Sequence, residues 1–253
     1  MQINRRIWNK YISALRKVND KAAAEMTAFL ETHNWLENNF VRQECVDFGY
    51  ALATKYGEAA GEIACEMYDA IADLSKANIL PAVPAKTATY DETAKAVIGT
   101  MKTENIETIA GSISRLVKMA GVDTTMQNAI RDHAEWAWIP SGDTCSFCIT
   151  LASRGWQPAS KSQLKGNHAE HIHANCDCTF AIRFSDDMDV QGYDPDEYLE
   201  MYNDAPGSSS QAKINAMRRE AYAENKDEIN AQKRSAYAKR QELNSSRAEE
   251  IDV

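Results

Sequence analysis

The sequence predicts a mainly α-helical chain that has a small α+β lobe and a C-terminal helical arm. Apolar residues recur at intervals of three and four through the first half, which is the period of an amphipathic helix. Cysteines and histidines gather between residues 145 and 178, and a polar, helix-prone segment follows "PGSSS" at 206–210. We therefore divide the chain into a helical domain (1–135), a cysteine lobe (136–185), an acidic segment with a linker (186–210) and an arm with a tail (211–253).

Composition restricts the classes of protein that this chain can belong to. Hydrophobic residues are 44% and charged residues 26% of 253, which is ordinary for a soluble globular protein. The formal net charge of −9 gives no overall positive field for nucleic acid. No apolar run reaches the roughly 18 residues of a membrane helix, and the first twenty residues lack the apolar core of a signal peptide. We therefore expect no membrane partner and a reducing compartment, where clustered cysteines bind metals or act as redox groups.

Residues 3 to about 80 are predicted to be helical. Gly57 and Gly61 are expected to separate helices, and "PAVP" at 81–84 ends the run because proline removes a backbone donor. The expected buried stripes are Ile7, Tyr11, Leu15, Val18, Ala22 and Met26, then Phe40 or Val41, Cys45, Phe48, Leu52 and Tyr56, then Ile63, Met67, Ile71 and Leu74.

A further helix is predicted over residues 90–120. Gly121 suits its C-terminal cap, and Asp123 suits the N-terminal cap of another helix that runs to about 136. No alternating pattern of a strand occurs before residue 136.

The cysteine lobe is predicted to contain two strands, at 136–139 and 178–184. Between them lie about forty residues that are poor in large apolar side chains. So long a stretch needs a constraint other than a hydrophobic core.

Metal-ligand spacing supplies that constraint. Cys145 and Cys148 have the two-residue gap of a ligand pair, and His173 and Cys176 have the same gap, with Cys178 close behind. Soft sulfur ligands with one imidazole favour tetrahedral Zn²⁺. Four of these five residues are expected to bind it, and the choice is most open for Cys178 and His173. A site with four protein ligands leaves no open position, so we predict a structural Zn²⁺ and no enzyme activity.

Other interpretations of the cluster fit the residues less well. A redox Cys-x-x-Cys is expected in a βαβ context, which the sequence does not indicate here. The deaminase pattern requires Cys-x-x-Cys well downstream of the histidine, whereas this chain has Cys-x-Cys. A zinc nuclease of the His–Asn–His kind is the better enzymatic alternative. We expect His168 and His171 to face solvent and Glu170 to have no catalytic role.

Beyond residue 185 the chain becomes acidic and then helix-prone. The acidic stretch does not match a calcium loop, so we expect a solvated loop that leads into a short helix. Residues 211–240 are rich in helix formers but have few apolar positions. This segment is either a solvated tail or an arm that docks on a partner, with Ile214, Met217, Ala221 and Ile229 as the expected contacts.

The segment "WIPSGDTCSFCITLASRG", followed by "HIHANCDCT", resembles the zinc-knuckle segment of phage minor head proteins of the Mu F type. The resemblance is close over about 45 residues, and it departs from many relatives in having "HAN" where they have His-Pro-Asn. The helical N-terminal region fits the plan of that family only loosely. The matching positions are Asp143, Cys145, Cys148, His173, Cys176 and Cys178.

The resemblance implies a minor capsid protein that acts in head morphogenesis without catalysis. It implies the portal protein and the major capsid protein as partners, with packaged DNA and a second copy of this chain as further candidates. It places the protein in the interior of the virion or procapsid near the portal, and in the host cytoplasm during assembly. The alternative is a zinc-dependent nucleic-acid-binding protein or nuclease.

Overall fold

A computed structural model describes the backbone of residues 1–36, 39–141, 144–161, 178–231, 233–235, 237–238 and 241. In these residues the chain is mainly helical with two small sheets, which confirms the predicted fold class apart from the metal. The helices are α1 (Arg5–Thr32), α2 (Asn39–Ser75), α3 (Tyr90–Met101), α4 (Ile106–Arg131), α5 (Ser146–Ala152), α7 (Pro195–Asp204) and α8 (Ser210–Glu224). The strands are β1 (Gln2–Ile3), β2 (Glu135–Ile139), β3 (Gln157–Pro158), β4 (Thr179–Arg183) and β5 (Asp189–Val190).

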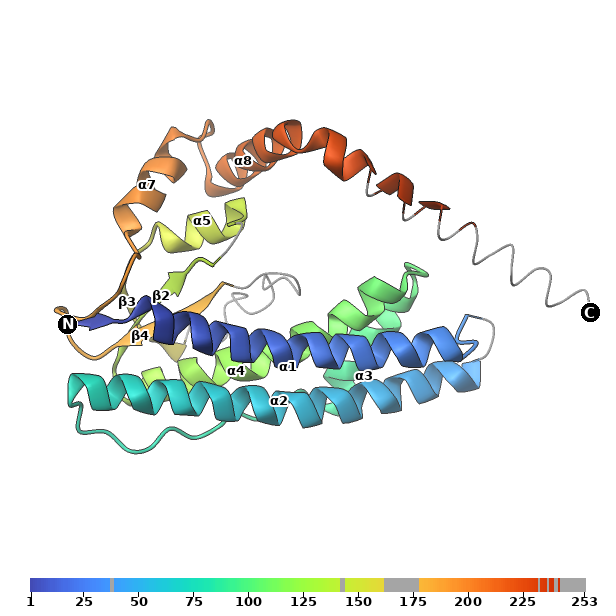
Figure 1. Cartoon of the computed structure of the whole chain (residues 1–253), viewed down its shortest axis with the longest axis horizontal. Helices are drawn as coiled ribbons and strands as arrows, with labels where there is room; N and C mark the ends of the chain where they lie inside the picture. The colour runs from blue at the N-terminus through green and yellow to red at the C-terminus, as the bar shows by residue number, and fades with distance from the viewer. Residues whose placement is uncertain are drawn as a thin grey trace, which may run out of the picture.

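Four helices form a bundle along the long axis of the molecule (Figure 1). The long helices α1 and α2 make an antiparallel hairpin, and α3 packs on α2 and α4. Helix α4 contacts all three others, so most of its side chains are buried. Ile109, Ile113 and Val117 are each 0% exposed. This central position explains why α4 lacks a clear polar face in the sequence.

The predicted break at Gly57 and Gly61 is wrong, because α2 continues through both residues. After α2 ends, the extended residues 76–89, which we call the strap, lie against this helix. A Cβ atom on Gly57 would stand 2.9 Å from Thr87 Cγ2, and one on Gly61 would stand 3.2 Å from Pro84 Cβ. The glycines therefore make room for the strap and do not end the helix.

The predicted helix boundary at Gly121 and Asp123 is also wrong, since α4 passes through both positions. A Cβ atom on Gly121 would lie 3.3 Å from the carbonyl oxygen of Ala60, so this glycine permits a close approach of α4 to α2. The real boundary falls earlier, between Met101 and Ile106. There Asn105 caps α4, its Oδ1 accepting a hydrogen bond from the Thr108 amide at 2.7 Å.

Several residues assigned to the buried stripes face solvent instead. Ile7 is 57% exposed and Phe40 is 72% exposed, while Trp8 and Val46 are buried. Leu74 is also exposed, in the last turn of α2. The stripes of Ile7 and Phe40 both begin next to the start of a helix. There the three- and four-residue period does not fix which of two adjacent residues is the first buried one.

Both predicted strands of the cysteine lobe are confirmed. Strands β2 and β4 are antiparallel, with Trp138 opposite Phe180, and β3 pairs with the other edge of β2. The lobe has no separate core: Trp138 and Phe180 belong to one buried cluster with Trp8 of α1 and Tyr68 of α2. The division between residues 135 and 136 therefore lies inside a continuous core.

The sequence did not predict the second sheet. The two-residue strand β1 pairs in parallel with β5, so that Ile3 lies opposite Val190. This pairing ties the start of the chain to the acidic segment after residue 185. A two-residue strand has no periodicity, and therefore no sequence pattern can indicate it.

The short helix expected after the acidic stretch is present as α7. Beyond it, α8 is not fully solvated, because Ile214, Ala216 and Met217 are buried. The expected contact Ala221 is exposed. The first turns of the arm therefore dock on their own chain, and Figure 1 shows α8 lying over α5 and then leading away from the bundle.

Candidate metal centre

The Cys145–Cys148 pair lies where α5 begins. Cys145 is the N-cap residue of α5 and Cys148 is in its first turn, so the helical backbone brings the two side chains together. Their Sγ atoms are 3.6 Å apart. Cys148 is 1% exposed and Cys145 is half-buried. The sequence did not predict α5, which is only seven residues long.

The sulfur separation shows that the pair is not a disulfide. A disulfide requires about 2.05 Å between sulfurs, whereas Cys145 Sγ donates a hydrogen bond to Cys148 Sγ at 3.6 Å and both cysteines are free. Two thiolates on one tetrahedral Zn²⁺, each about 2.3 Å from the metal, stand about 3.8 Å apart. The two sulfurs therefore lie close enough to share one zinc ion.

Cys178 lies directly before β4 and is 0% exposed. It belongs to the same buried cluster as Cys148, and its Sγ is 4.0 Å from the carbonyl oxygen of Ser141. Within the part of the chain that the structure describes, no three His, Cys, Asp or Glu side chains form a group able to hold a metal. Of the other predicted ligands, His173 and Cys176 lie outside the described residues.

Two tyrosines, Tyr193 and Tyr198, belong to the clusters that contain α5 residues. Burial raises the pKa of Tyr193, and its hydroxyl donates a hydrogen bond to the carbonyl of Ala152 at 2.8 Å. Burial also raises the pKa of Tyr198, and the negative charge of Glu197 raises it further. Both tyrosines therefore stay protonated at neutral pH.

The topology also bears on the redox interpretation. Helix α5 connects β2 to β3, and these two strands are antiparallel. A βαβ unit, in which a redox Cys-x-x-Cys is expected, requires parallel strands. The pair thus lacks that context. The residues of the enzymatic alternative, His168, Glu170 and His171, lie outside the described part of the chain, as does Asp143, so the expectations about them stay predictions.

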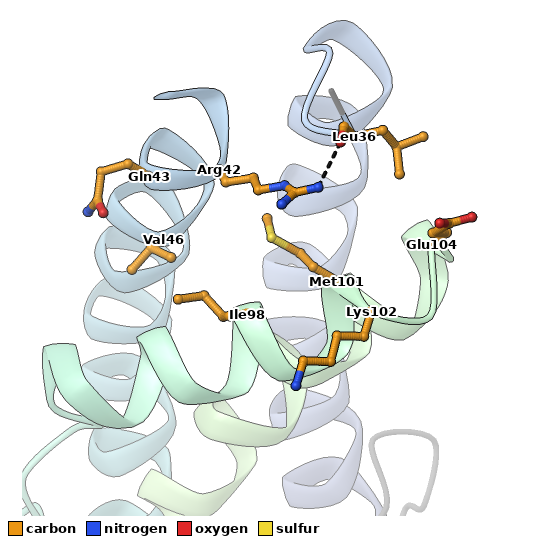
Figure 2. A pocket seen from close by; sticks show the side chains of 8 residues that line it. All are labelled: Leu36, Arg42, Gln43, Val46, Ile98, Met101, Lys102 and Glu104. Atoms are coloured by element: carbon orange, nitrogen blue, oxygen red, sulfur yellow. Dashed lines mark hydrogen bonds between the residues drawn. The ribbon is translucent and has the colours of Figure 1, made fainter. Parts of the chain in front are cut away.

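A pocket of about 620 Å³ lies at the other end of the bundle, near the α1–α2 connection (Figure 2). Arg42 donates hydrogen bonds to the carbonyls of Trp35 at 3.1 Å and Leu36 at 2.7 Å, which closes that connection. The described lining contains one carboxylate and neither histidine nor cysteine. No sequence motif marked it. The lining residues are Leu36, Arg42, Gln43, Val46, Ile98, Met101, Lys102 and Glu104.

Among the helices that the structure describes, none combines the length and the apolar character that crossing a bilayer requires.

Fold and site together define a helical-bundle protein with a small cysteine-pair lobe built onto its core. A comparison with family models matches residues 2–205 to the VG15 protein family. The match covers about four fifths of the chain, from β1 to the end of α7. The chain belongs to the VG15 protein family, and it is therefore a phage protein. Searches of curated proteins and of solved structures found no match.

Proposed function

We propose that this phage protein is a minor capsid protein of the Mu F type that acts in head morphogenesis. It works with the portal protein and the major capsid protein as a non-enzymatic assembly factor inside the procapsid or virion. The observation that carries the proposal is the family match, which extends over the bundle, the cysteine lobe and α7. The "CSFC" and "HIHANCDCT" segments add the resemblance to the Mu F type.

The metal in this proposal is a structural Zn²⁺. Cys145 and Cys148 supply two of its four ligands, and two of the three residues Cys178, His173 and Cys176 supply the others. The fit rests on the 3.6 Å separation of the two sulfur atoms. A seven-residue helix is marginal by itself because helix nucleation is costly. Bound metal would hold the start of α5 in place, and in small lobes metal-binding energy is largely folding energy.

Elemental analysis tests the metal directly. Protein purified without chelators should carry about one zinc per chain. Cys148→Ala should lose that zinc and lose protection of α5 and β4 against amide exchange. Cys45→Ala is the matched control, because Cys45 is equally buried but lies in the bundle, and this variant should keep its zinc. Zinc-free wild-type protein would contradict the structural metal site.

Particle composition tests the assembly role. We expect the chain in procapsids assembled with the portal protein and its loss from procapsids assembled without it. Equal amounts of this chain in procapsids assembled with and without the portal protein would contradict an assembly role that depends on the portal. A cleavage assay on DNA addresses the alternative: metal-dependent cutting that Glu170→Gln abolishes would favour the zinc nuclease and overturn the non-enzymatic assignment.

A further inference from the structure

We propose that the metal site holds α5 as the docking surface for α8, so that metal binding and arm docking are coupled. The inference rests on the structural metal site proposed above and adds to it a mode of regulation. It assigns two states to the arm, one docked on its own chain and one with its apolar residues exposed.

Helix α5 has two buried faces that pack against different parts of the molecule. Cys148, Leu151 and Ala152 lie in the main core with the strands of the cysteine lobe. Ile149, on the other face, lies in a separate small cluster with Ile214 and Met217 of α8. Phe147 packs against both clusters. One side of the short helix α5 therefore contacts the core that contains Cys148, and another side contacts the arm.

The docking surface for α8 is formed by α5 and by the end of α7. We call it the seat; its buried residues are Ile149 and Ala205, with Phe147, Tyr198 and Tyr202 partly buried around them. The ammonium group of Lys213 also holds the arm. It donates hydrogen bonds to the carbonyls of Tyr202, Asn203 and Ala205 at 2.9, 2.9 and 3.0 Å.

These contacts are few for a helix of fifteen residues. Only Ile214, Ala216 and Met217 are buried in α8, and α7 has no buried residue within its own bounds. An isolated helix of this length is marginal in water, so α8 depends on the seat for its order. The loss of a few contacts with the seat is therefore enough to release α8.

The coupling follows from the dependence of the seat on α5. A metal bound by the two sulfurs would fix the first turn of α5, and Ile149 is the next residue after Cys148. Without metal the turn loses that constraint, and Ile149 loses its fixed position against Met217. Two binding events that share one structural element affect each other reciprocally. Disrupting the arm should therefore also weaken metal binding.

Release would expose an interaction surface that is covered in this structure. Ile214 and Met217 are three residues apart and lie on one face of α8. A helix that presents such a pair binds an apolar groove of a partner. The apolar seat would be exposed at the same time.

Hydrogen–deuterium exchange on the full chain tests the coupling. Chelation of zinc should speed exchange in residues 210–224 by about tenfold or more, while α4 stays protected. Met217→Glu should release the arm with metal bound, and it should lower the affinity for Zn²⁺ about fivefold or more, measured by competition with a chromophoric chelator. Ala221→Glu is the matched control, since Ala221 is exposed on the same helix, and it should change neither quantity.

The outcomes separate the two proposals. Wild-type protein that binds no zinc would overturn the metal site itself. Protein that binds about one zinc, but whose α8 exchange is the same with and without chelator, would overturn the coupling and leave the metal site standing. Unchanged zinc affinity in Met217→Glu would also overturn the coupling, because linkage requires a reciprocal effect.

Discussion

The bundle and the pair of helices α7 and α8 are built differently. In the bundle, α4 is buried against three other helices, and large side chains such as Ile109 and Leu30 are fully covered. On the other side, α8 buries three residues and α7 buries none. The bundle is therefore stabilised by apolar burial, whereas α7 and α8 depend on a few specific contacts: the hydrogen bonds of Lys213 and a small apolar cluster with Ile149 of α5.

The two regions therefore differ in how easily they open. A region with many buried apolar contacts opens only with global unfolding, whereas a region with few of them opens locally. The bundle is thus a scaffold, and α7 and α8 are the part of the molecule that can change state without unfolding the rest. The same substitution should consequently have very different effects in the two regions.

The largest effect is expected in the bundle. Ile113 is 0% exposed, and Ile113→Ala should lower the free energy of unfolding by about 3 kcal/mol through lost burial and the cavity that remains. Urea unfolding followed by far-UV circular dichroism measures this. Ile7→Ala is the control, since Ile7 is 57% exposed and should change stability little. Equal losses in both variants would show that α4 is not the central element of the core.

A smaller effect is expected at Asp123, a carboxyl group within α4. Burial, together with the charge of Glu92, raises its pKa to about 6. Because the folded state holds this proton more tightly than the unfolded state, stability falls as the pH rises from about 4 to about 6, and the penalty is fully present above that range. Asp123→Asn should therefore stabilise the protein by about 2 kcal/mol at pH 7 and hardly at all at pH 4.

Urea unfolding at both pH values measures the effect of Asp123→Asn. The exposed Asp73→Asn in α2 serves as the control. A stabilisation that is the same at both pH values would show that the gain does not come from removing a buried charge.

The smallest effect on global stability is expected in the arm. Ile214→Ala makes the same chemical change as Ile113→Ala, but Ile214 packs only in the small cluster around Ile149. We expect less than about 0.5 kcal/mol of change in global unfolding, with faster amide exchange confined to α8. A global loss as large as that of Ile113→Ala would show that α8 belongs to the same cooperative unit as the bundle.

Much of the secondary structure was predictable, because it depends on local patterns. The period of apolar residues predicted the helical first half. The prolines of "PAVP" at 81–84 predicted that α2 ends before this segment. The patterns at 136–139 and 178–184 predicted β2 and β4. Helix ends at glycines were predicted wrongly, since Gly57 and Gly121 serve close packing between segments that are distant in sequence.

The candidate site was predictable only in part. The two-residue gap of Cys145 and Cys148 indicated a ligand pair, and the structure places their sulfurs 3.6 Å apart. Neither α5 nor the docking of α8 on it could be read from the sequence. A seven-residue helix shows barely two turns of periodicity, and Ile214 and Met217 look isolated until Ile149 is placed opposite them.

The sequence by itself determined the elements whose causes are local: amphipathic helices, strands with alternating or apolar runs, and the two-residue spacing of Cys145 and Cys148. Tertiary structure alone decided which glycines admit a neighbour, that the cysteine lobe shares its core with the bundle, and that the first turns of the arm fold back onto α5. The reason is physical. A backbone conformation responds mainly to its nearest residues, whereas burial depends on what the rest of the chain brings to the other side of the contact.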